Sequence, residues 1–320
     1  GANFTSAILA SPRAMRANFT SAIFDKTKTT KMDASEATFN KATIKNSTFS
    51  TLVAPKASIK ETAIDWSNLT EVNLFGADLS NSTIKESTFS SAIISKGKFE
   101  NSSISNSTFN KSTLYSTDFS GSNIKDVSFI DTDLSFSSLI NSKLIFSNFD
   151  TTNLQNTNVK NSDLTGSQLK NVDGYHLYAS GANFTGVVIV NSDLNGLNAE
   201  NADITGVDLS GQKLLNVKLD NSTSSAWTKW PSGHSAISTG STTKSFITDV
   251  PCDLTKIQDC NGKDLRNIDF AGKDLKYLYF QEADLSGANM VEADLSNARM
   301  KAAVLAGAGL TNSNLRGVDL

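Results

Sequence analysis

An apolar side chain returns at every fifth position of the chain, most strictly between Ser82 and Leu169. The series there begins Ile84, Phe89, Ile94, Phe99, Ile104, Phe109, Leu114, Phe119, Ile124 and Phe129. An amphipathic helix repeats near 3.6 residues and a half-buried strand repeats near 2, so neither element explains this spacing. The pattern predicts a repeat architecture in which the chain turns at a fixed interval and buries one apolar centre on each side.

The register of these centres continues without a slip from Phe4 to Leu219. The residue two positions before each centre is usually Ala or Ser, which predicts that both side chains point into a narrow core. Where the centre shrinks to Ala, the earlier residue grows, as in Met32 with Ala34, Leu52 with Ala54, Leu177 with Ala179 and Leu197 with Ala199. The position two after the centre is often Asn or Gly, types that tolerate a positive φ, so we expect the corners there.

Sorting the centres with a period of 20 collects like residues into columns. One column holds Phe49, Phe89, Phe109, Phe129 and Phe149, and another holds Ile44, Ile64, Ile84, Ile104 and Ile124. This sorting predicts a four-sided coil whose successive turns stack like on like. The exposed series Asp25, Lys45, Asp65 and Lys85 should then stand in a column at the strand spacing of about 4.8 Å.

The phase of the repeat divides the chain into three parts. Residues 1–220 form a first block of about 11 coils, residues 221–262 an irregular insertion, and residues 263–320 a second block of about 3 coils. The second block resumes one residue out of phase, so the insertion is a true interruption. We expect the second block to stack on the first, giving about 14 coils, because a short block alone would have a small core and open edges.

Several units match a known repeat closely. They are ADLSG at 283–287, ADLSN at 293–297, and GANFT at both 1–5 and 181–185. In these segments the chain resembles the pentapeptide repeat family, whose units read roughly Ala, Asp or Asn, Leu or Phe, and two variable residues. The resemblance implies an all-β fold, a right-handed quadrilateral β-helix.

Composition and charge change this picture little. The hydrophobic fraction is 38% and the net charge is −3, but the apolar residues are phased, which favours a thin continuous core over disorder. No apolar run is long enough to predict a membrane span. Residues 1–60 carry a net charge of +6, from nine Lys or Arg against three Asp or Glu. Their lysines lack interleaved recognition motifs, so no nucleic-acid partner is expected: Lys26, Lys28, Lys31, Lys41 and Lys45.

Candidate catalytic chemistry is sparse. His176 and His234 are the two histidines of the chain, and neither lies beside a serine in a nucleophile motif. We interpret the carboxylates that recur one residue before the centres as part of the repeat's own turn chemistry: Asp118, Asp133, Asp163, Asp193, Asp203 and Asp208. The sequence therefore predicts no enzyme, no cofactor and no metal site.

The two cysteines, Cys252 and Cys260, lie eight residues apart in the insertion. A metal site there would lack ligands, which leaves a local disulfide, the favoured interpretation, or two free thiols. A disulfide would indicate an oxidising compartment. The family resemblance is compatible with a thylakoid lumen, a periplasm or secretion.

An exposed column suggests where a partner could bind. The residues one after the centre on one side are Met15, Ser35, Pro55, Phe75, Ser95, Tyr115, Ser135, Gln155, Tyr175, Asn195 and Leu215, of which six are apolar or aromatic. We expect Phe75, Tyr115 and Tyr175 to contact a protein partner. Scattered surface hydrophobes are the alternative interpretation. Further aromatic candidates are Phe136 and Phe146 two after their centres, and Trp227 and Trp230 in the insertion.

These observations favour a non-enzymatic scaffold, a rigid rod that presents flat faces to protein partners and could be a subunit of a larger assembly. Open coil ends would favour stacking on a partner or on another copy of the chain. The family resemblance supplies an alternative, because some pentapeptide repeat proteins inhibit DNA gyrase by imitating duplex DNA. Such mimicry needs a strongly acidic surface, whereas lysines are distributed along this chain.

Overall fold

The structure is a computed structural model that describes residues 1–224, 228–230, 242–243, 252, 254 and 260–320. Trp227 and His234 lie outside the described residues. The chain divides into two compact units. The first comprises Gly1–Ala182, Ile189–Glu200 and Gln212–Lys218, and the second comprises Asn183–Val188, Asn201–Gly211 and Leu219–Leu320. The boundaries expected from the sequence, and the stacking of the second block on the first, stay predictions.

Short parallel strands are the regular elements of the described chain, and their bounds are β1 (Ile8–Ala10), β2 (Ile23–Asp25), β3 (Lys28–Thr30), β4 (Thr43–Lys45), β5 (Thr48–Ser50), β6 (Ala63–Asp65), β7 (Thr83–Lys85), β8 (Ser103–Ser105), β9 (Asn123–Lys125), β10 (Lys143–Ile145), β11 (Gln168–Lys170), β12 (Val188–Val190), β13 (Thr223–Ser224) and β14 (Thr242–Thr243). They form a seven-stranded sheet in the order β10-β9-β8-β7-β6-β4-β2, a three-stranded sheet in the order β1-β3-β5, and the pairs β11-β12 and β13-β14. Among the described residues, no helix is long and apolar enough to span a membrane.

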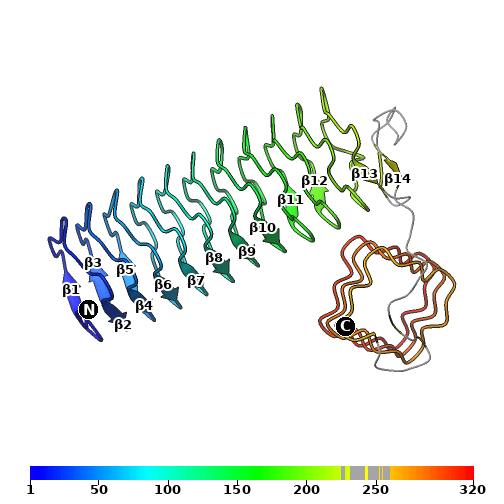
Figure 1. The fold of residues 1–320 in the computed structure, drawn as a ribbon, viewed down its shortest axis with the longest axis horizontal. Coiled ribbons are helices and arrows are strands. Elements are labelled where there is room, and N and C mark those ends of the chain that lie inside the picture. Colours follow the sequence, from blue (N-terminus) through cyan, green and yellow to red (C-terminus); the bar gives the residue numbers. More distant parts are fainter. Residues whose placement is uncertain (225–227, 231–241, 244–251, 253, 255–259) are drawn as a thin grey trace. The chain divides into compact units, whose positions relative to one another are not determined.

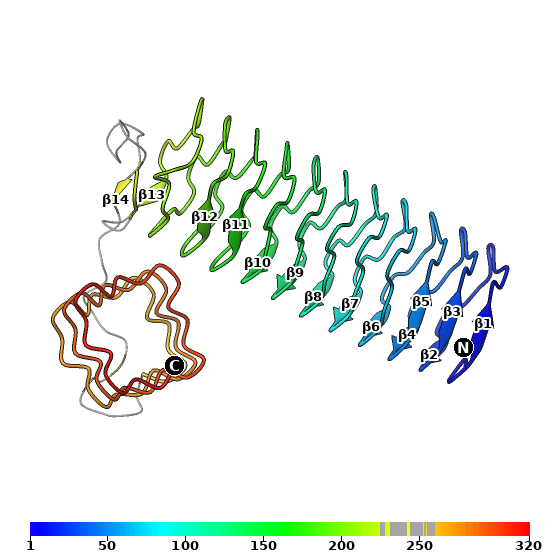
Figure 2. The same cartoon turned by 180° about the vertical axis from the view of Figure 1, so that it is seen from behind.

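Each turn of the chain pairs with the turn twenty residues later. Isolated parallel bridges extend this register beyond the strands, from Asn3 paired with Ile23 to Asp203 paired with Thr223. The same offset returns in the second unit, from Asp264 paired with Asp284 to Arg299 paired with Asp319. Figures 1 and 2 show the coils of the first unit one behind another, and in Figure 1 the coils of residues 263–320 superpose as a four-sided ring. The predicted fold class, a quadrilateral β-solenoid, is confirmed.

The corners fall two residues after the centres, as predicted. In the first block φ is positive at every fifth residue from Ser6 to Gly206, and again at Asn216 and Asn221. This geometry matches the third residue of a type II turn, which usually favours Gly or Asn. The residue types are broader than expected, because Trp66, Phe136 and other bulky side chains also occupy corners. Stacking of the coils therefore outweighs a local backbone cost of about 1 to 2 kcal/mol for each such residue.

The core consists of the predicted columns. The phenylalanine rings of one column stack with centroid separations of 4.9 Å for Phe89 and Phe109, 5.5 Å for Phe109 and Phe129, and 5.2 Å for Phe129 and Phe149. Ile44, Ile64, Ile84, Ile104 and Ile124 pair in register in the adjacent column. Both members of each size-compensated pair are buried, as in Met32 with Ala34. The columns thus fill the narrow interior without changing its width.

Hydroxyl groups inside the coils complete the backbone hydrogen bonding. The Ser47 Oγ accepts a bond from the Thr27 backbone N–H at 3.0 Å and donates to the Phe24 carbonyl at 2.9 Å. Ser67 and Ser87 repeat the acceptor role for the amide twenty residues earlier. Buried Ser and Thr are therefore tolerated because their hydroxyls bond the corner backbone.

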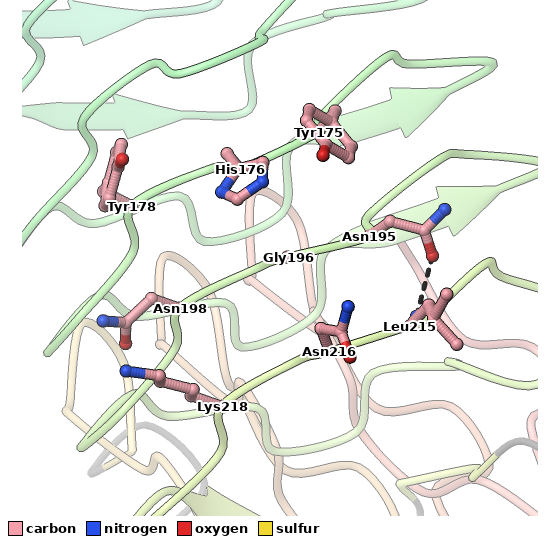
Figure 3. A pocket seen from close by; sticks show the side chains of 9 residues that line it. All are labelled: Tyr175, His176, Tyr178, Asn195, Gly196, Asn198, Leu215, Asn216 and Lys218. Carbon is pink, nitrogen blue, oxygen red and sulfur yellow. Dashed lines mark hydrogen bonds between the residues drawn. The ribbon is translucent and has the colours of Figure 1, made fainter.

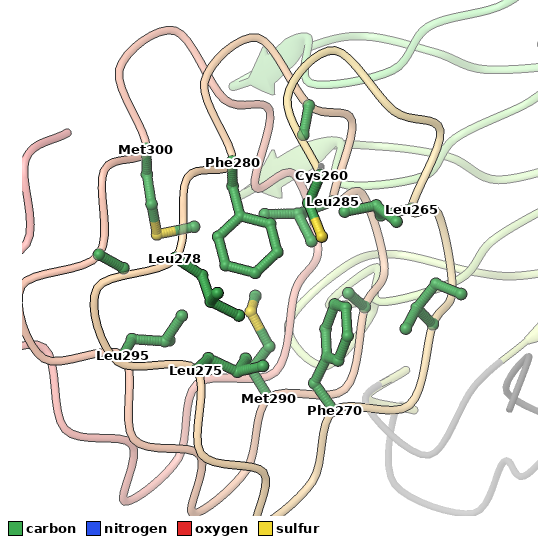
Figure 4. Packing of buried hydrophobic residues seen from close by; sticks show 14 of the residues in the cluster. Cys260, Leu265, Phe270, Leu275, Leu278, Phe280, Leu285, Met290, Leu295 and Met300 are labelled. Carbon is green, nitrogen blue, oxygen red and sulfur yellow. The ribbon is translucent and has the colours of Figure 1, made fainter. Parts of the chain in front are cut away.

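The second unit has its own apolar core (Figure 4), built from stacked centres such as Leu265, Leu285 and Met300. The structure joins Cys252 to Cys260 by a disulfide with a Cα separation of 5.1 Å. Both cysteines are buried in this core, and Leu254 packs against it. The disulfide thus holds residues of the insertion against the beginning of the second block.

Candidate interaction surface

One side of the first unit carries the exposed aromatic column expected from the sequence. Phe75, Tyr115 and Tyr175 are exposed on it, as are Met15 and Leu215. The coils stack with a period of twenty residues. The residues one position before and two positions after the same apolar centres therefore also form columns on this side. We call this side the aromatic face, and its apolar and aromatic members are Met15, Val53, Phe75, Ile93, Tyr115, Phe136, Tyr175, His176 and Leu215.

The rings on the aromatic face contact one another and their neighbours. The rings of Tyr115 and Phe136 lie 5.5 Å apart, at an angle of 55°. The Lys96 ammonium lies 5.8 Å from the Phe75 ring centroid, within the range of a cation–π contact. Tyr175 and His176 meet edge to face, with centroids 4.2 Å apart. The exposed rings are therefore held in place by neighbours and present ready-made contact area.

Some members of the face were missed when the sequence was sorted by one column alone. Val53 and Ile93 stand one residue before their centres, yet they share this face and are 40% and 46% exposed. Phe136 was a separate candidate, and the structure brings it against Tyr115. Sorting all three outward columns with the period of 20 would have found these residues.

Other candidate residues lie elsewhere. Phe146 belongs to the side that carries β9 and β10, and its ring lies over Gly166, where an added Cβ would come within 2.4 Å of the ring. Trp230 is half-buried in the second unit. The structure therefore does not place Phe146 on the aromatic face. The assignment of these residues to a partner surface stays a prediction.

A notch opens at the corner where the aromatic face meets the neighbouring side. It spans three successive coils and has a volume of about 380 Å³. Gly196 lies at its centre, where the coils on either side carry His176 and Asn216 at the same corner. Figure 3 shows Tyr175, His176 and Tyr178 on one side of Gly196, and Leu215, Asn216 and Lys218 on the other. The missing side chain at Gly196 creates the notch.

The conformation of Gly196 also favours glycine. Its φ is +73°, and an added Cβ would lie 3.2 Å from three atoms of the His176 imidazole. The imidazole therefore leans across the glycine, as the Phe146 ring does at Gly166. A glycine corner thus accommodates the side chain of the preceding coil.

The recurring carboxylates have a structural role that explains their position. Each carboxylate accepts a hydrogen bond from the backbone N–H two residues later. The N···O distance is 2.9 Å for Asp118 and 3.0 to 3.1 Å for Asp133, Asp163, Asp193, Asp203 and Asp208. These Asx turns stabilise the extended side before the corner. Among the described residues, no group of three or more His, Cys, Asp or Glu gathers to hold a metal ion.

Charges on the side next to the aromatic face are paired between coils. Lys60 Nζ lies 3.0 Å from Asp78 Oδ2, and this hydrogen bond raises the pKa of Lys60. Partial burial raises the pKa of Asp78, but hydrogen bonds from Ser80 and Lys60 outweigh it, so the pKa is lowered overall. Arg16 and Glu36 form a similar pair on the aromatic face at 2.8 Å. At these positions, opposite charges on neighbouring coils are thus paired.

Comparison with protein families locates the repeat in both blocks. A family described as a pentapeptide repeat region matches residues 102–177. A second family description, pentapeptide repeats (8 copies), matches residues 67–106, 176–211, 264–301 and 283–320. Together the matches cover more than half of the 320 residues.

Similar solved structures are also pentapeptide repeat proteins. HetL from the cyanobacterium Nostoc sp. strain PCC 7120, involved in heterocyst differentiation regulation, is 19% identical over 82% of this chain and 89% of its own, with a TM-score of 0.30. Full-length QnrB1, a plasmid-mediated fluoroquinolone resistance protein, is 16% identical over 69% of this chain and 92% of its own, with a TM-score of 0.34. Similarities at this level say nothing about function. No curated protein matches the chain.

The family matches agree with the geometry described above. Parallel pairing at an offset of twenty, corners at every fifth residue and stacked apolar centres are found in both units. These features follow from the same five-residue unit that the family descriptions match. The chain is a member of the pentapeptide repeat family.

Proposed function

We propose that this protein is a non-enzymatic scaffold whose aromatic face binds a protein partner. The observation that carries the proposal is the gathering of exposed aromatic and aliphatic side chains on one of four sides. Tyr115 and Phe136 represent it best, because their rings are 39% and 54% exposed while contacting each other. Exposed aromatic clusters of this kind are typical of protein interfaces.

The dimensions of the face suit an elongated contact. Phe75 and Tyr175 are five coils apart, which corresponds to about 24 Å at a spacing of about 4.8 Å per coil. That length fits within an interface of ordinary size, about 800 Å² on each partner. Because the residues stand on a regular stack of coils, they need little reordering to bind.

The ion pairs between coils support a protein partner over imitation of DNA. A DNA-like surface needs closely spaced negative charges without compensating cations. Here Lys41 pairs with Glu61 at 3.6 Å, and Lys213 pairs with Asp193 at 3.1 Å. These pairs reduce the acidic field along the rod.

A matched pair of triple variants tests the proposal. Phe75, Tyr115 and Tyr175 are replaced together by Ser. The control replaces Ile23, Trp66 and Val190 by Ser, because these residues are comparably exposed and lie on other sides. A partner captured from the native source by the wild-type protein should bind the control variant but lose affinity for the aromatic-face variant. Equal binding to both variants would reject the aromatic face as the partner surface.

A further inference from the structure

The notch at Gly196 is a concave site that the scaffold function does not require. It lies wholly within the first unit and extends over three coils. Its volume of about 380 Å³ lies within the range of small-molecule sites, which is about 300 to 1,000 Å³. The notch is therefore large enough for one small ring-shaped ligand.

Side-chain amides line the notch on the coil of Gly196 and on the coil that follows it. The Asn195 Oδ1 accepts a hydrogen bond from the Leu215 backbone N–H at 2.7 Å, and the Asn198 Oδ1 accepts one from the Glu200 N–H at 3.2 Å. These bonds fix both side chains and leave their amide nitrogens as donors. Asn216 adds an amide with both a donor and an acceptor, and Figure 3 shows it directed toward Gly196.

The charge of the notch favours a neutral ligand. Lys218 is the one Lys, Arg, Asp or Glu among its nine lining residues. The Lys218 ammonium lies 4.0 Å from the Glu200 carboxylate, which reduces its attraction for an anion. A purely apolar ligand is also disfavoured, because it would leave the amides without partners when it excludes water.

Two tyrosines supply the apolar part of the site. Tyr175 and Tyr178 are 47% and 46% exposed and stand on the same coil, on either side of His176. A pyranose ring matches this combination, because it has C–H groups on its faces and hydroxyls along its edge. The C–H faces pack on aromatic rings, and each hydroxyl can both donate to and accept from an amide.

From these observations we propose that the notch binds a neutral pyranose sugar, either free or as the terminal unit of a glycan. The tyrosines contact the sugar ring, and Asn195, Asn198 and Asn216 bond its hydroxyls. The absence of a side chain at Gly196 provides the space. Because the notch shares Tyr175, His176 and Leu215 with the aromatic face, a sugar bound there would compete with a partner that covers this coil.

Saturation-transfer NMR on the full chain tests the proposal. The probes are the methyl glycosides of glucose, galactose, mannose, xylose and N-acetylglucosamine, with maltotriose and cellotriose as glycans and glucuronate as the anionic comparison. A single sugar ring should bind with a Kd of about 1 mM, given the ligand's small size. Binding of a trisaccharide but of no methyl glycoside would assign the site to glycans.

Gly196→Asn is the decisive variant because it fills the notch. Asn156 and Asn216 already adopt φ of 54° and 57° in the same corner column, so Asn can adopt this backbone conformation, although the His176 imidazole, 3.2 Å from the added Cβ, must shift. Gly76→Asn is the matched control, since Gly76 has a φ of +65° and lies at this corner six coils away, where an added Cβ would meet the Lys56 Cγ at an ordinary contact distance of 3.8 Å. Tyr178→Ala removes a ring that is proposed to pack on the sugar, and Asn216→Ala removes an amide that is proposed to bond its hydroxyls.

We expect Gly196→Asn to weaken sugar binding by about tenfold or more, while Gly76→Asn binds as the wild type does. Tyr178→Ala and Asn216→Ala should each weaken it, with melting curves confirming that every variant is folded. The proposal is overturned if the wild-type protein binds none of the neutral sugars at about fifty times the expected Kd. Equal binding to Gly196→Asn, or binding of glucuronate alone, would also overturn it.

Discussion

Thr29 lies in the core column between Leu9 and Phe49, and its side chain is fully buried. It occupies a centre that elsewhere carries an apolar residue. Its hydroxyl has no hydrogen-bond partner within the described residues. Thr27, two residues earlier, is equally buried, but its hydroxyl donates to the Phe4 carbonyl at 2.7 Å. The hydroxyl of Thr27, two residues before the centre, is therefore satisfied by the backbone, whereas the hydroxyl of Thr29 at the centre is not.

We expect Thr29→Val to stabilise the protein, because it removes an unsatisfied buried hydroxyl while keeping the shape of the side chain. The gain should be about 1 to 3 kcal/mol in the free energy of unfolding, measured by urea denaturation. Thr27→Val is the matched control and should destabilise instead, because it removes a satisfied hydrogen bond. Similar effects of both substitutions would contradict the assigned roles.

The stacked phenylalanine column predicts a large cost for its interruption. Phe109 packs between Phe89 and Phe129, and its side chain is fully buried. Phe109→Ala should lower the free energy of unfolding by about 3 to 5 kcal/mol, because it leaves a cavity between two rings. Phe146→Ala, on the surface, should cost much less. Equal losses would show that the column does not stabilise the coil stack.

The disulfide predicts a redox-dependent stability of the second unit. Replacing both Cys252 and Cys260 by Ser should destabilise this unit by about 2.5 kcal/mol, the value that loop closure gives for so short a separation. Differential scanning calorimetry with and without reductant measures the effect. Mass spectrometry of the non-reduced, alkylated protein checks the bond itself. Two alkylated thiols in freshly isolated protein would contradict it.

We expect Asp294 to make a contribution to the stability of the second unit that is lost in acid. A hydrogen bond from the Ser296 side chain is the main cause that lowers the pKa of Asp294 to about 2, aided by the Ser296 backbone N–H, Asn314 and Lys276. Because the folded pKa lies below the ordinary value of 3.8, the charged form stabilises the fold above that pH. This stabilisation should be lost as the pH falls from about 4 to about 2. Asp294→Asn should therefore flatten the dependence of the melting temperature on pH in this range, and an unchanged slope would argue against this origin.

Much of the fold could be predicted from the sequence, because one five-residue unit repeats along the chain and sets its geometry. The five-residue period, the twenty-residue columns through Phe109 and Ile104, and the corner positions all follow from apolar spacing. The bulky residues at corners did not follow, since stacking holds Trp66 in a conformation that local preference disfavours. Thr29 was missed because a polar residue at one centre does not break the register.

The surface was less predictable than the core. Tyr115 was identified from its column, but its contact with Phe136 joins two coils and two different columns. The notch depends on a side chain that Gly196 lacks and on how His176 leans across it. Such features arise from neighbours twenty residues apart, and a search for motifs along the chain does not compare those positions.

Site-specific photocrosslinking around a single coil tests the proposed partner surface most directly. Ser105, Asn110, Tyr115 and Ser120 each follow a centre and belong to the four successive sides of one coil. A photoreactive phenylalanine analogue is placed at each position in turn, in the presence of the captured partner. The account predicts a strong crosslink from position 115, weaker ones from 110 and 120 on the two adjoining sides, and the weakest from 105 on the opposite side. Equal crosslinking from all four positions, or a dominant crosslink from 105 or 110, would contradict it.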